Sequence, residues 1–478
     1  MTDENITTLN KKHFVAQEGG KTRVYNEGFD RVLNRDVITN SSFDDFRNLY
    51  LNKYAEIEKP NAKGKIETKF VSIGDFWLRN IDRRQYDEIV FAPGSEEQVG
   101  IYNLWRGFKI KPKENGSWEL LQKHILDNVC SGNEEYYNYY LDWWSNAIQF
   151  PDQQANVAIV LKGKRGGGKG TAIGYFAELF GQHHIHVFST RQVTGNFNYH
   201  MRDAVVLYSD EAVYAGNKAE ESVLKGLITE KFIPIEGKHR DLIMVKNNLH
   251  VVMSTNNEWA VPAGLDERRF FVLNMKDDEE VKQNTAYFNA IKLQMMNGGN
   301  EKLLFDMQQR DISQFNTYKA PNTVGLLEQK IQSLDSLQAW WYEKLSSGYI
   351  FDGIDWQKEM PAESVYIDYI NRCKDHGSKY RENSTHFGRF LSEMMPKEAG
   401  CKIAKGEIVC WPEISRRQPE KFFEENKLLL SVGPTKKHYR FPELDACRAT
   451  FDKIAGHKIN WPVLLSSKMT GTSSLEAI

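Results

Sequence analysis

The segment from Val157 to Thr171, VAIVLKGKRGGGKGT, restricts the possible folds of this chain more than any other segment. Its first five residues are mostly apolar and predict a buried strand, and apolar residues after Thr171 recur at helical spacing. A strand, a glycine-rich loop, a lysine and a helix in this order are typical of a phosphate-binding loop. The glycines let backbone N–H groups turn towards an anion, and the lysine reaches the outer phosphates. We therefore expect a nucleoside triphosphate site; the alternative is a surface turn in which Gly and Lys gather by chance.

The loop departs from the usual pattern at one position. Gly170 follows the lysine where Ser or Thr is usual, so the hydroxyl expected to bind Mg²⁺ falls one place later, at Thr171. The same GKGT ending occurs in nucleoside-monophosphate kinases, and a phosphotransferase of that kind is the first alternative function. The residues expected to bind the nucleotide are Gly163, Arg165, Gly166, Gly167, Gly168, Lys169, Gly170 and Thr171.

Polar residues follow the next two apolar runs of the chain. Ala204–Tyr208 predicts a strand, and Asp210 and Glu211 come soon after it. An acidic pair at the carboxyl end of a buried strand suits Mg²⁺–ATP, with Asp210 at the metal and Glu211 polarising the attacking water. Leu249–Met253 predicts a third strand. After it, Asn256 could contact the γ-phosphate or orient that water; a simple turn is the alternative.

Two adjacent arginines, Arg268 and Arg269, precede a fourth predicted strand at Phe270–Leu273. Paired arginines at the edge of such a domain could enter the ATP site of a neighbouring subunit and stabilise charge on the transferred phosphoryl group. The alternative is an exposed ion pair with Asp266 or Glu267. Either arginine fits the first interpretation equally well.

A β-hairpin with a basic tip is predicted between the second and third strands, over Phe232–Val245. The tip carries Lys238, His239 and Arg240. Adjacent donors on a protruding turn could follow a phosphodiester backbone without reading its sequence. A solvated hairpin end is the alternative.

Composition narrows the class of protein without selecting one function. The 478 residues are too many for one ordinary core, so we expect several domains. A content of 41% hydrophobic and 26% charged residues is ordinary for a globular protein. No apolar run approaches a membrane span, and the start of the chain is polar, so we expect no membrane partner. Five scattered cysteines favour reduced thiols in a cytosol-like compartment, the host cytoplasm if the chain is phage-encoded. With a net charge of −2, any contact with nucleic acid must use local basic patches.

The chain divides into segments of different character. Aromatic residues at helical spacing in Glu134–Ile148 predict a helix packed into the core. Two predicted helices at Ser364–Asp375 and Thr385–Met395, then a strand-like stretch at Cys401–Trp411 and basic residues among aromatics, predict two helices with a β-rich wing. That module could bind DNA or dock a protein. The predicted segments are a mixed domain (1–115), a helical collar for oligomerisation (116–150), the nucleotide domain (151–300), a helical connector (301–335), the C-terminal domain (336–465) and a flexible tail (466–478).

Together these motifs resemble the superfamily 3 helicases, in particular the helicase part of the poxvirus-type primase-helicases of phages and plasmids. The loop at Gly163–Thr171, the Asp210–Glu211 pair, the Lys238–His239 tip and Asn256 follow the order of that family. Tyr102–Phe108 also resembles a segment ahead of the helicase core in phage members. The resemblance implies an α/β fold: an AAA+-like, P-loop nucleotide domain with a parallel sheet, and a winged-helix-like C-terminal domain.

The same resemblance implies a function. In the family the lysine and histidine of the hairpin tip contact single-stranded DNA in the channel of a hexamer, and an arginine acts on the ATP of the next subunit. The expected protein is thus an ATP-dependent replicative DNA helicase, a ring-forming homo-oligomer that uses ATP and Mg²⁺. No residues upstream suggest primase carboxylates, so a primase or polymerase would be a separate chain. A replication-initiator scaffold that binds ATP without turnover is the second alternative.

Overall fold

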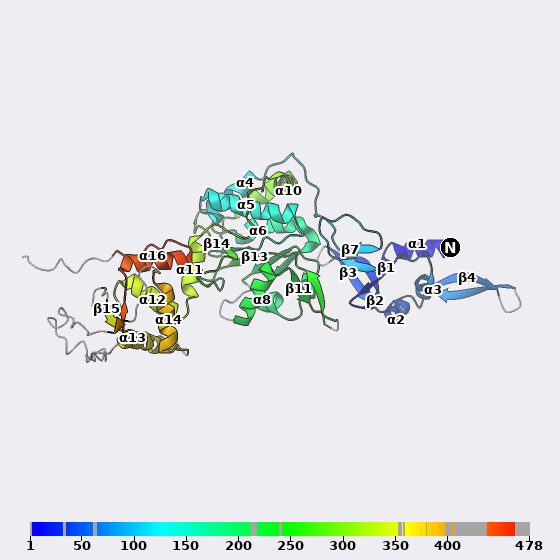
Figure 1. Cartoon of the computed structure of the whole chain (residues 1–478). Coiled ribbons are helices and arrows are strands. Elements are labelled where there is room, and N and C mark those ends of the chain that lie inside the picture. Colours follow the sequence, from blue (N-terminus) through cyan, green and yellow to red (C-terminus); the bar gives the residue numbers. More distant parts are fainter. Residues whose placement is uncertain are drawn as a thin grey trace, which may run out of the picture. The chain divides into compact units, whose positions relative to one another are not determined.

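A computed structural model describes residues 2–31, 35–60, 65–211, 218–238, 241–351, 356, 359–378, 380–396, 404–405 and 437–463 (Figure 1). The chain forms two compact units, one of Met1–Val261 with Arg268–Gly325 and one of Pro262–Glu267 with Leu326–Ile478. The finer segment boundaries derived from the sequence stay predictions. Among the described residues, no helix combines the length and the apolar character that crossing a membrane requires.

A five-stranded sheet with the order β14-β8-β13-β10-β9 forms the centre of the first unit. All its neighbouring strands pair in parallel, so every strand ends at the same edge. Each strand predicted around the glycine loop is present, although the second begins and ends two residues later than expected and includes Asp210. The strands are β8 (Ala158–Lys162), β9 (His184–Val187), β10 (Val206–Asp210), β13 (His250–Thr255) and β14 (Phe270–Asn274).

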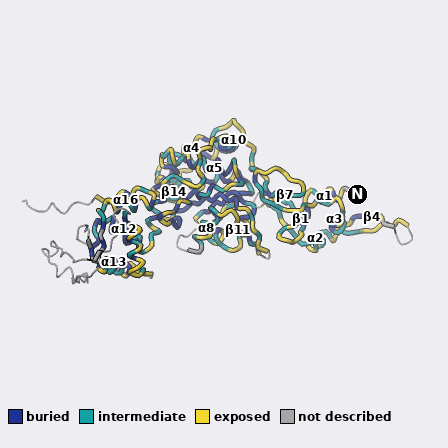
Figure 2. Tube along the Cα trace, in the orientation of Figure 1, coloured by how far each residue is buried: buried dark blue, intermediate teal, exposed yellow. Residues whose placement is uncertain are grey.

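Helices cover both faces of this sheet, and the buried residues of the unit concentrate between them (Figures 1 and 2). The predicted aromatic helix is α5, which buries Trp143 and Trp144 completely, a wider face than the expected stripe. Trp144 stacks on Phe176 at 5.0 Å between ring centroids, which joins α5 to the helix after the glycine loop. Helices α4 (Glu119–His124), α5 (Glu134–Gln149), α6 (Lys169–Ala177) and α10 (Asn300–Gln309) lie on one side, and α8 (Lys218–Thr229) lies on the other.

Shorter elements connect these layers. π-Helical turns follow α4 and α9, and 3₁₀ turns follow α6 and precede β10. The helical conformation is interrupted between α9 and α10, where Gly298 has a φ of 93°. The remaining elements of this part are a π turn (Ile125–Val129), a 3₁₀ turn (Glu178–His183), α7 (Thr190–Thr194), a 3₁₀ turn (Tyr199–Met201), β11 (Phe232–Ile235), β12 (Ile243–Lys246), α9 (Thr285–Gln294) and a π turn (Met295–Gly299).

The N-terminal part of the first unit contains both helices and strands. Its main sheet is antiparallel with the order β1-β2-β3, and β4 with β5 and β6 with β7 form two-stranded pairs. Phe14 of β1 stacks on Tyr25 and Tyr102, which joins this sheet to β7. The elements are α1 (Thr2–Asn10), β1 (His13–Glu18), β2 (Lys21–Asp30), β3 (Arg35–Ser41), α2 (Phe43–Leu49), β4 (Tyr54–Pro60), β5 (Ile66–Ser72), α3 (Ile73–Arg79), β6 (Glu88–Val90) and β7 (Ile101–Asn103).

The segment Tyr102–Phe108 connects the N-terminal sheet to the parallel sheet. The Trp105 ring stacks on His183 at 4.7 Å, directly before β9. The backbone N–H of Arg106 donates to His183 Nε2 at 2.9 Å, and the Arg106 guanidinium pairs with Glu27 of β2 at 3.1 Å. One short segment therefore holds β2 and the edge of the parallel sheet together. These contacts give a physical role to a segment that was identified in the sequence by resemblance alone.

The second unit packs helices against a three-stranded antiparallel sheet with the order β15-β17-β16. Trp340, Trp341, Tyr369, Phe387 and Phe451 are fully buried in its core. Both predicted helices are present. The predicted strand-like stretch at Cys401–Trp411 lies outside the described residues except for 404–405. The predicted tail (466–478) and the basic residues between 416 and 436 also lie outside them. The elements are α11 (Val324–Gln332), α12 (Ser336–Ser347), β15 (Glu359–Pro361), α13 (Ala362–Asp375), α14 (Ser384–Met394), β16 (Ala404–Lys405), β17 (Lys437–Arg440) and α16 (Leu444–Ala455).

Candidate functional site

The glycine loop joins the carboxyl end of β8 to the first turn of α6. Gly166 and Gly168 have φ angles of 81° and 90°, a left-handed conformation that glycine adopts without a steric penalty. Lys169 is the first residue of α6, and its Nζ donates to the carbonyl oxygens of Gly163 at 2.6 Å and Lys164 at 3.0 Å. The lysine therefore lies across the loop, where its charge faces the space that the loop encloses.

Side chains from distant segments support the loop from outside. A Cβ atom on Gly168 would lie 2.5 Å from His124 Nε2, and one on Gly166 would lie 2.7 Å from Gln283 Cγ. Both glycines are thus required by close packing as well as by their backbone angles. Sequence reasoning assigned no role to His124 or Gln283, and no local pattern marks either of them.

His124 is buried and lies between the loop and α9. Its Nε2 is 3.3 Å from the carbonyl oxygen of Gly168, and its Nδ1 is 3.1 Å from the hydroxyl of Tyr287. Burial lowers the pKa of His124, although the hydrogen bond to Gly168 opposes this shift. A neutral imidazole with Nε2–H donating to Gly168 and Nδ1 accepting from Tyr287 satisfies both contacts.

The acidic pair lies at the carboxyl end of β10, next to β13. The hydroxyl of Ser254 donates to the Asp210 carboxylate and lies 3.0 Å from the hydroxyl of Tyr208. The Glu211 N–H donates to the Ser254 carbonyl at 2.8 Å. Glu211 has a φ of 52°, a strained conformation for a residue other than glycine, and such strain concentrates at functional sites. This geometry turns the Glu211 side chain out of the strand direction.

Asn256 connects the loop lysine to the acidic pair. Its Oδ1 accepts from Lys169 Nζ at 2.6 Å, and its Nδ2 donates to the Glu211 carboxylate. Glu211 and Asn256 follow the ends of β10 and β13, and Lys169 begins α6 after the loop that leaves β8. These three strands are adjacent in the sheet. Burial lowers the pKa of Lys169, while the charges of Asp210 and Glu211 oppose that shift. The structure therefore assembles Lys169, Asn256 and Glu211 into one hydrogen-bonded chain.

The remaining loop residues lie around this chain. A Cβ atom on Gly170 would lie 3.9 Å from the Tyr208 hydroxyl, so the start of α6 is adjacent to β10. Thr171 is half-buried in the first turn of α6. Arg165 and Gly167 line the outer side of the loop together with Lys164, whose Nζ pairs with Asp277. Within the described ranges no cluster of His, Cys, Asp and Glu forms a ready metal site.

Arg268 and Arg269 lie at the opposite edge of the parallel sheet. Phe270 begins β14 and pairs with Ala158, the first residue of β8, whereas the glycine loop follows the last residue of β8. Five residues of strand rise roughly 15 Å at about 3.3 Å each, which separates these arginines from the loop of their own chain. Arg268 is exposed and Arg269 is half-buried.

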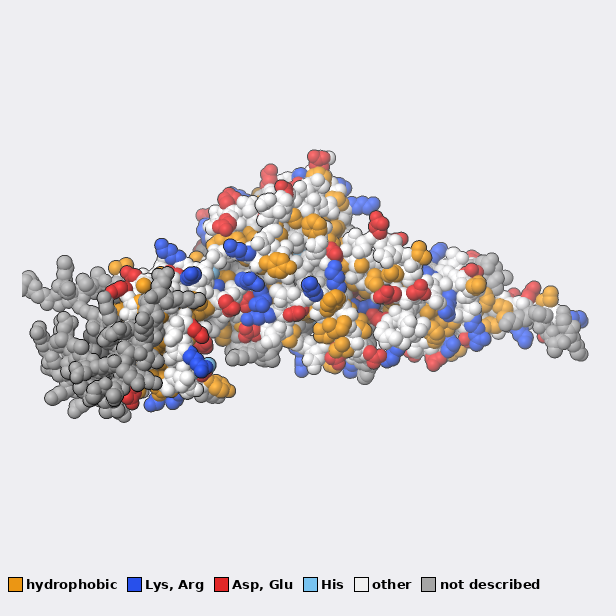
Figure 3. Space-filling view, in the orientation of Figure 1, with side chains coloured by type: hydrophobic (Ala, Val, Ile, Leu, Met, Phe, Trp, Pro, Cys, Tyr) orange, Lys and Arg blue, Asp and Glu red, His pale blue; other side chains and the backbone are white. Residues whose placement is uncertain are grey.

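The predicted hairpin is present as β11 paired antiparallel with β12. Lys238 is exposed near its tip, and His239 and Arg240 lie outside the described residues. Hydrophobic side chains gather over the hairpin in Figure 3, where Phe232, Leu242 and Met244 are each more than half exposed. The hairpin therefore carries exposed apolar side chains, with Lys238 near its tip.

Residues 161–269, which include the loop, the acidic pair, Asn256 and the hairpin, match a family of unknown function (DUF5906). A stretch of 184 residues is 22% identical to the DNA primase-polymerase of Nitratiruptor phage NrS-1, and it covers 37% of this chain and 25% of that protein. The chain thus spans only a quarter of the length of this relative.

Solved structures of the C-terminal region of NrS-1 share the fold. An apo structure of that region superposes with a TM-score of 0.57 at 15% identity, covering 84% of this chain and 95% of the other. Its A form gives a TM-score of 0.58 at 13% identity and covers 91% and 98%. The likeness therefore extends over most of the chain. The chain therefore shares its fold with the C-terminal region of NrS-1.

Proposed function

We propose that this chain is an ATP-dependent, ring-forming DNA helicase of phage replication. The observation that carries the proposal is the Lys169–Asn256–Glu211 chain at the carboxyl edge of the parallel sheet, directly beside the glycine loop. An amide between a phosphate-binding lysine and a carboxylate can report the state of the outer phosphate to the residue that orients water. The similarity to the phage NrS-1 primase-polymerase supports a setting in phage DNA replication.

The residues present suit ATP with Mg²⁺. Lys169 now donates to Gly163 and Lys164 carbonyls, and the same ammonium group can turn to β- and γ-phosphate oxygens. Thr171 and Asp210 supply the hydroxyl and carboxylate oxygens that Mg²⁺ prefers, and the ion would neutralise charge developing on the phosphates. The loop glycines direct N–H groups at the anion, with the N-terminus of α6 behind them. Arg165 is exposed on the loop, where it would contact the triphosphate.

Glu211 and Asn256 would act on the attacking water. The carboxylate accepts a proton from the water as it attacks the γ-phosphate, and Asn256 holds that carboxylate by its Nδ2 donor. Asn256 Oδ1 accepts from Lys169, so loss of the γ-phosphate changes the position of the lysine and the amide together. Product formation is thereby coupled to movement at the end of β13.

Arg268 and Arg269 would complete the site of a neighbouring subunit. They lie at the amino edge of their own sheet, so they cannot reach the phosphates of the same chain. A ring, for which a hexamer is the family arrangement, brings the amino edge of one sheet to the loop of the next. Hydrolysis would then depend on assembly, and the hairpin tip with Lys238, His239 and Arg240 would contact single-stranded DNA. A primase or polymerase would act as a separate partner or domain.

The winged-helix-like assignment of the C-terminal unit belongs to the same proposal. Helices α12, α13 and α14 surround the sheet β15-β17-β16, and the chain enters β15 between the first two of these helices. This order is compatible with a winged helix. The module would serve DNA or protein docking.

The direct test is ATP hydrolysis by Lys169→Ala in the presence of single-stranded DNA. Loss of one phosphate donor lowers the rate by roughly 10²–10³-fold. Lys164→Ala is the matched control, because Lys164 lies in the same loop but pairs outward with Asp277, and it should keep the wild-type rate within a few fold. Equal rates for Lys169→Ala and wild type would contradict the proposal. Conversion of nucleoside monophosphates to diphosphates would favour a kinase, and binding of ATP without any turnover would favour a scaffold.

A further inference from the structure

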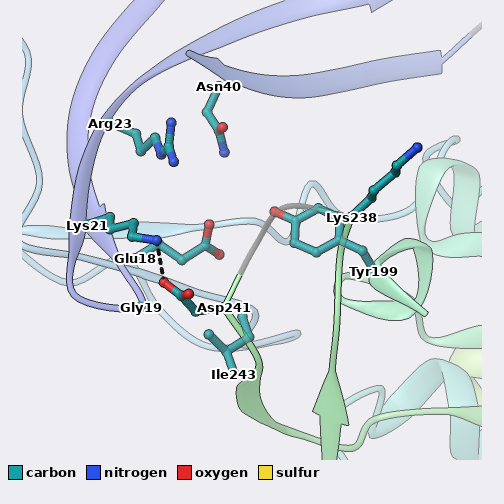
Figure 4. A pocket seen from close by; sticks show the side chains of 9 residues that line it. All are labelled: Glu18, Gly19, Lys21, Arg23, Asn40, Tyr199, Lys238, Asp241 and Ile243. Atoms are coloured by element: carbon teal, nitrogen blue, oxygen red, sulfur yellow. Dashed lines mark ion pairs between the residues drawn. The ribbon is translucent and has the colours of Figure 1, made fainter. Parts of the chain in front are cut away.

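A polar cavity of about 150 Å³ lies between the N-terminal sheet and the hairpin, away from the glycine loop (Figure 4). Both of its walls belong to the first unit. Strands β2 and β3 supply Lys21, Arg23 and Asn40, and the other wall includes Tyr199 and Lys238. Nothing in the hydrolytic site uses these N-terminal residues.

Strand register explains why the polar groups of the first wall share one face. Lys21 and Arg23 are two residues apart on β2, and Asn40 of β3 pairs with Tyr25, a further two residues along. Alternate residues of a strand point to the same side, so all three side chains face the hairpin. Figure 4 shows the guanidinium of Arg23, the amide of Asn40 and the hydroxyl of Tyr199 converging on the cavity.

The cavity is fixed to the hairpin by hydrogen bonds. Asn198 donates from Nδ2 to the Pro234 carbonyl at 2.8 Å and accepts from the Glu236 N–H at 2.8 Å, which ties the turn carrying Tyr199 to the hairpin. Arg202 donates to the Tyr199 hydroxyl at 2.7 Å and pairs with Glu18 of β1. Tyr199 therefore has a defined position between the two walls.

Cations outnumber carboxylates around the cavity. Lys21, Arg23 and Lys238 line it with Glu18 and Asp241. The Glu18 carboxylate is already engaged, because it is paired with a buried arginine and accepts from the Tyr25 hydroxyl at 2.9 Å. Asp241 pairs with Lys21 at 2.7 Å, but both side chains are more than half exposed, so this contact is weak and a competing anion can replace Asp241.

We propose that this cavity is a second contact for single-stranded DNA, in which Lys21 and Arg23 of the N-terminal sheet hold a phosphodiester and Tyr199 stacks on a base. The identity of the ligand rests on the proposed helicase function, since Lys238 at the hairpin tip continues the same basic surface. Basic side chains beside an aromatic ring are the usual combination for single strands, because every base offers a face for stacking. The N-terminal sheet thus gains a role in holding the strand that the hairpin moves.

The test measures the affinity of the full chain for a fluorescein-labelled oligothymidylate by anisotropy, over a range of salt concentrations and with a non-hydrolysable ATP analogue. The Lys21→Ala/Arg23→Ala variant should bind about tenfold more weakly or worse, because it loses two charged donors. The slope of log affinity against log salt should fall by roughly 0.7 for each lost phosphate contact. Arg47→Ala is the matched control: it removes an arginine of the same domain that pairs with Asp44 and Asp75 outside the cavity.

Tyr199 provides a second readout that a structural role alone would not produce. Tyr199→Leu should weaken binding, and Tyr199→Phe should restore most of it, because the ring and not the hydroxyl stacks on the base. An oligonucleotide carrying 5-iodouracil should cross-link on irradiation to a peptide that contains Tyr199. Thermal unfolding of each variant verifies that it is folded.

The outcomes separate this inference from the proposed function. The inference would be overturned if the Lys21→Ala/Arg23→Ala variant kept the wild-type affinity for DNA and the wild-type salt slope. Cross-links confined to peptides outside the cavity would also overturn it. Those results would leave ATP hydrolysis by the wild-type chain intact. Absence of DNA-stimulated hydrolysis in the wild-type chain would instead count against the helicase function, whatever the cavity variants do.

Discussion

The carboxyl edge of the parallel sheet and the cavity beside the hairpin are both lined by polar residues, yet they are assembled differently. At the sheet edge, Glu211 and Asn256 directly follow the buried strands β10 and β13, and Lys169 follows β8 after the glycine loop. Parallel pairing of these strands brings the three residues together. In the cavity, Arg23 and Tyr199 come from separate sheets and turns that meet only through long-range packing. The first arrangement suits chemistry that needs short, fixed distances, and the second suits a surface that contacts an extended chain.

Amino-acid substitutions in the two regions should therefore affect different activities of the protein. Substitutions at the sheet edge should remove ATP hydrolysis, whereas substitutions in the cavity should change the affinity for DNA. Under the proposed function, the arginines at the far edge of the sheet would act with the first region of a neighbouring subunit, although they are distant from it within one chain.

The largest effect is expected from Arg268→Ala/Arg269→Ala. Removal of an arginine that stabilises the transferred phosphoryl group lowers hydrolysis by about 10³-fold or more. The same variant has an intact glycine loop, so mixing it with Lys169→Ala should restore part of the activity at mixed interfaces. Steady-state hydrolysis of the mixture, compared with each variant alone, measures this. A double variant as fast as wild type with DNA present would exclude a site shared between subunits.

Glu211→Gln should lower hydrolysis by roughly 10²–10³-fold and leave ATP binding close to wild type, because an amide cannot accept the proton of the attacking water. Equilibrium binding of a fluorescent ATP analogue and single-turnover hydrolysis measure the two quantities separately. Asp277→Asn is the matched control, since Asp277 pairs with Lys164 and Lys282 and is not part of the Lys169–Asn256–Glu211 chain. A proportional loss of binding and hydrolysis in Glu211→Gln would point to a structural role.

The sequence predicted the local parts of this fold well. The apolar runs, the glycine loop and the polar residues after each strand placed Lys169, Asp210, Glu211 and Asn256 at one edge, and the structure brings them together. Short-range patterns carry that information because a strand end and the following turn are contiguous in the chain.

Residues that act across long sequence separations were not predictable in the same way. His124 reaches Gly168 from a helix far upstream, and Gln283 reaches Gly166 from a turn downstream. No periodicity links such residues, since tertiary packing alone makes them neighbours. The end of β10 was also misplaced by two residues, because pairing with β13 extends the strand to Asp210 beyond its apolar run. The contact of Ser254 with Asp210 depends on the same register.

The sheet that carries the site should lose stability on acidification. Burial lowers the pKa of both His183 and His250 from 6.5 to about 4. The unfolded chain therefore binds protons below about pH 6.5 that the folded chain excludes, so stability is full above that pH and falls towards pH 4. Each histidine would contribute a loss of up to roughly 3 kcal/mol.

His183 gives a structural reason for this sensitivity. Its Nδ1–H donates to the Asp203 carbonyl at 2.7 Å, and Nε2 accepts from the Arg106 N–H, so protonation of Nε2 breaks the contact to the N-terminal sheet. Chemical unfolding at a series of pH values measures the effect. His386→Gln, at an exposed position, is the control and should follow wild type. A flat stability profile between pH 6.5 and 4 would contradict buried neutral histidines.

The smallest effect is expected from Asp241→Asn in the cavity. Removal of this carboxylate releases Lys21 from an exposed ion pair worth about 0–1 kcal/mol, so DNA should bind up to roughly fivefold more tightly. Anisotropy with a labelled oligothymidylate measures the change in affinity for DNA. The rate of ATP hydrolysis should stay at the wild-type value, because Asp241 is not part of the site at the sheet edge. Weaker binding by Asp241→Asn would count against a phosphodiester beside Lys21.

The most direct test of the central claim is electron microscopy of the chain with a non-hydrolysable ATP analogue and single-stranded DNA. The account predicts a closed ring in which the analogue lies in the glycine loop beside Glu211 and Asn256, with Arg268 or Arg269 of the neighbouring copy at its outer phosphate. A monomer, or a ring whose nucleotide lies away from the glycine loop, would contradict it.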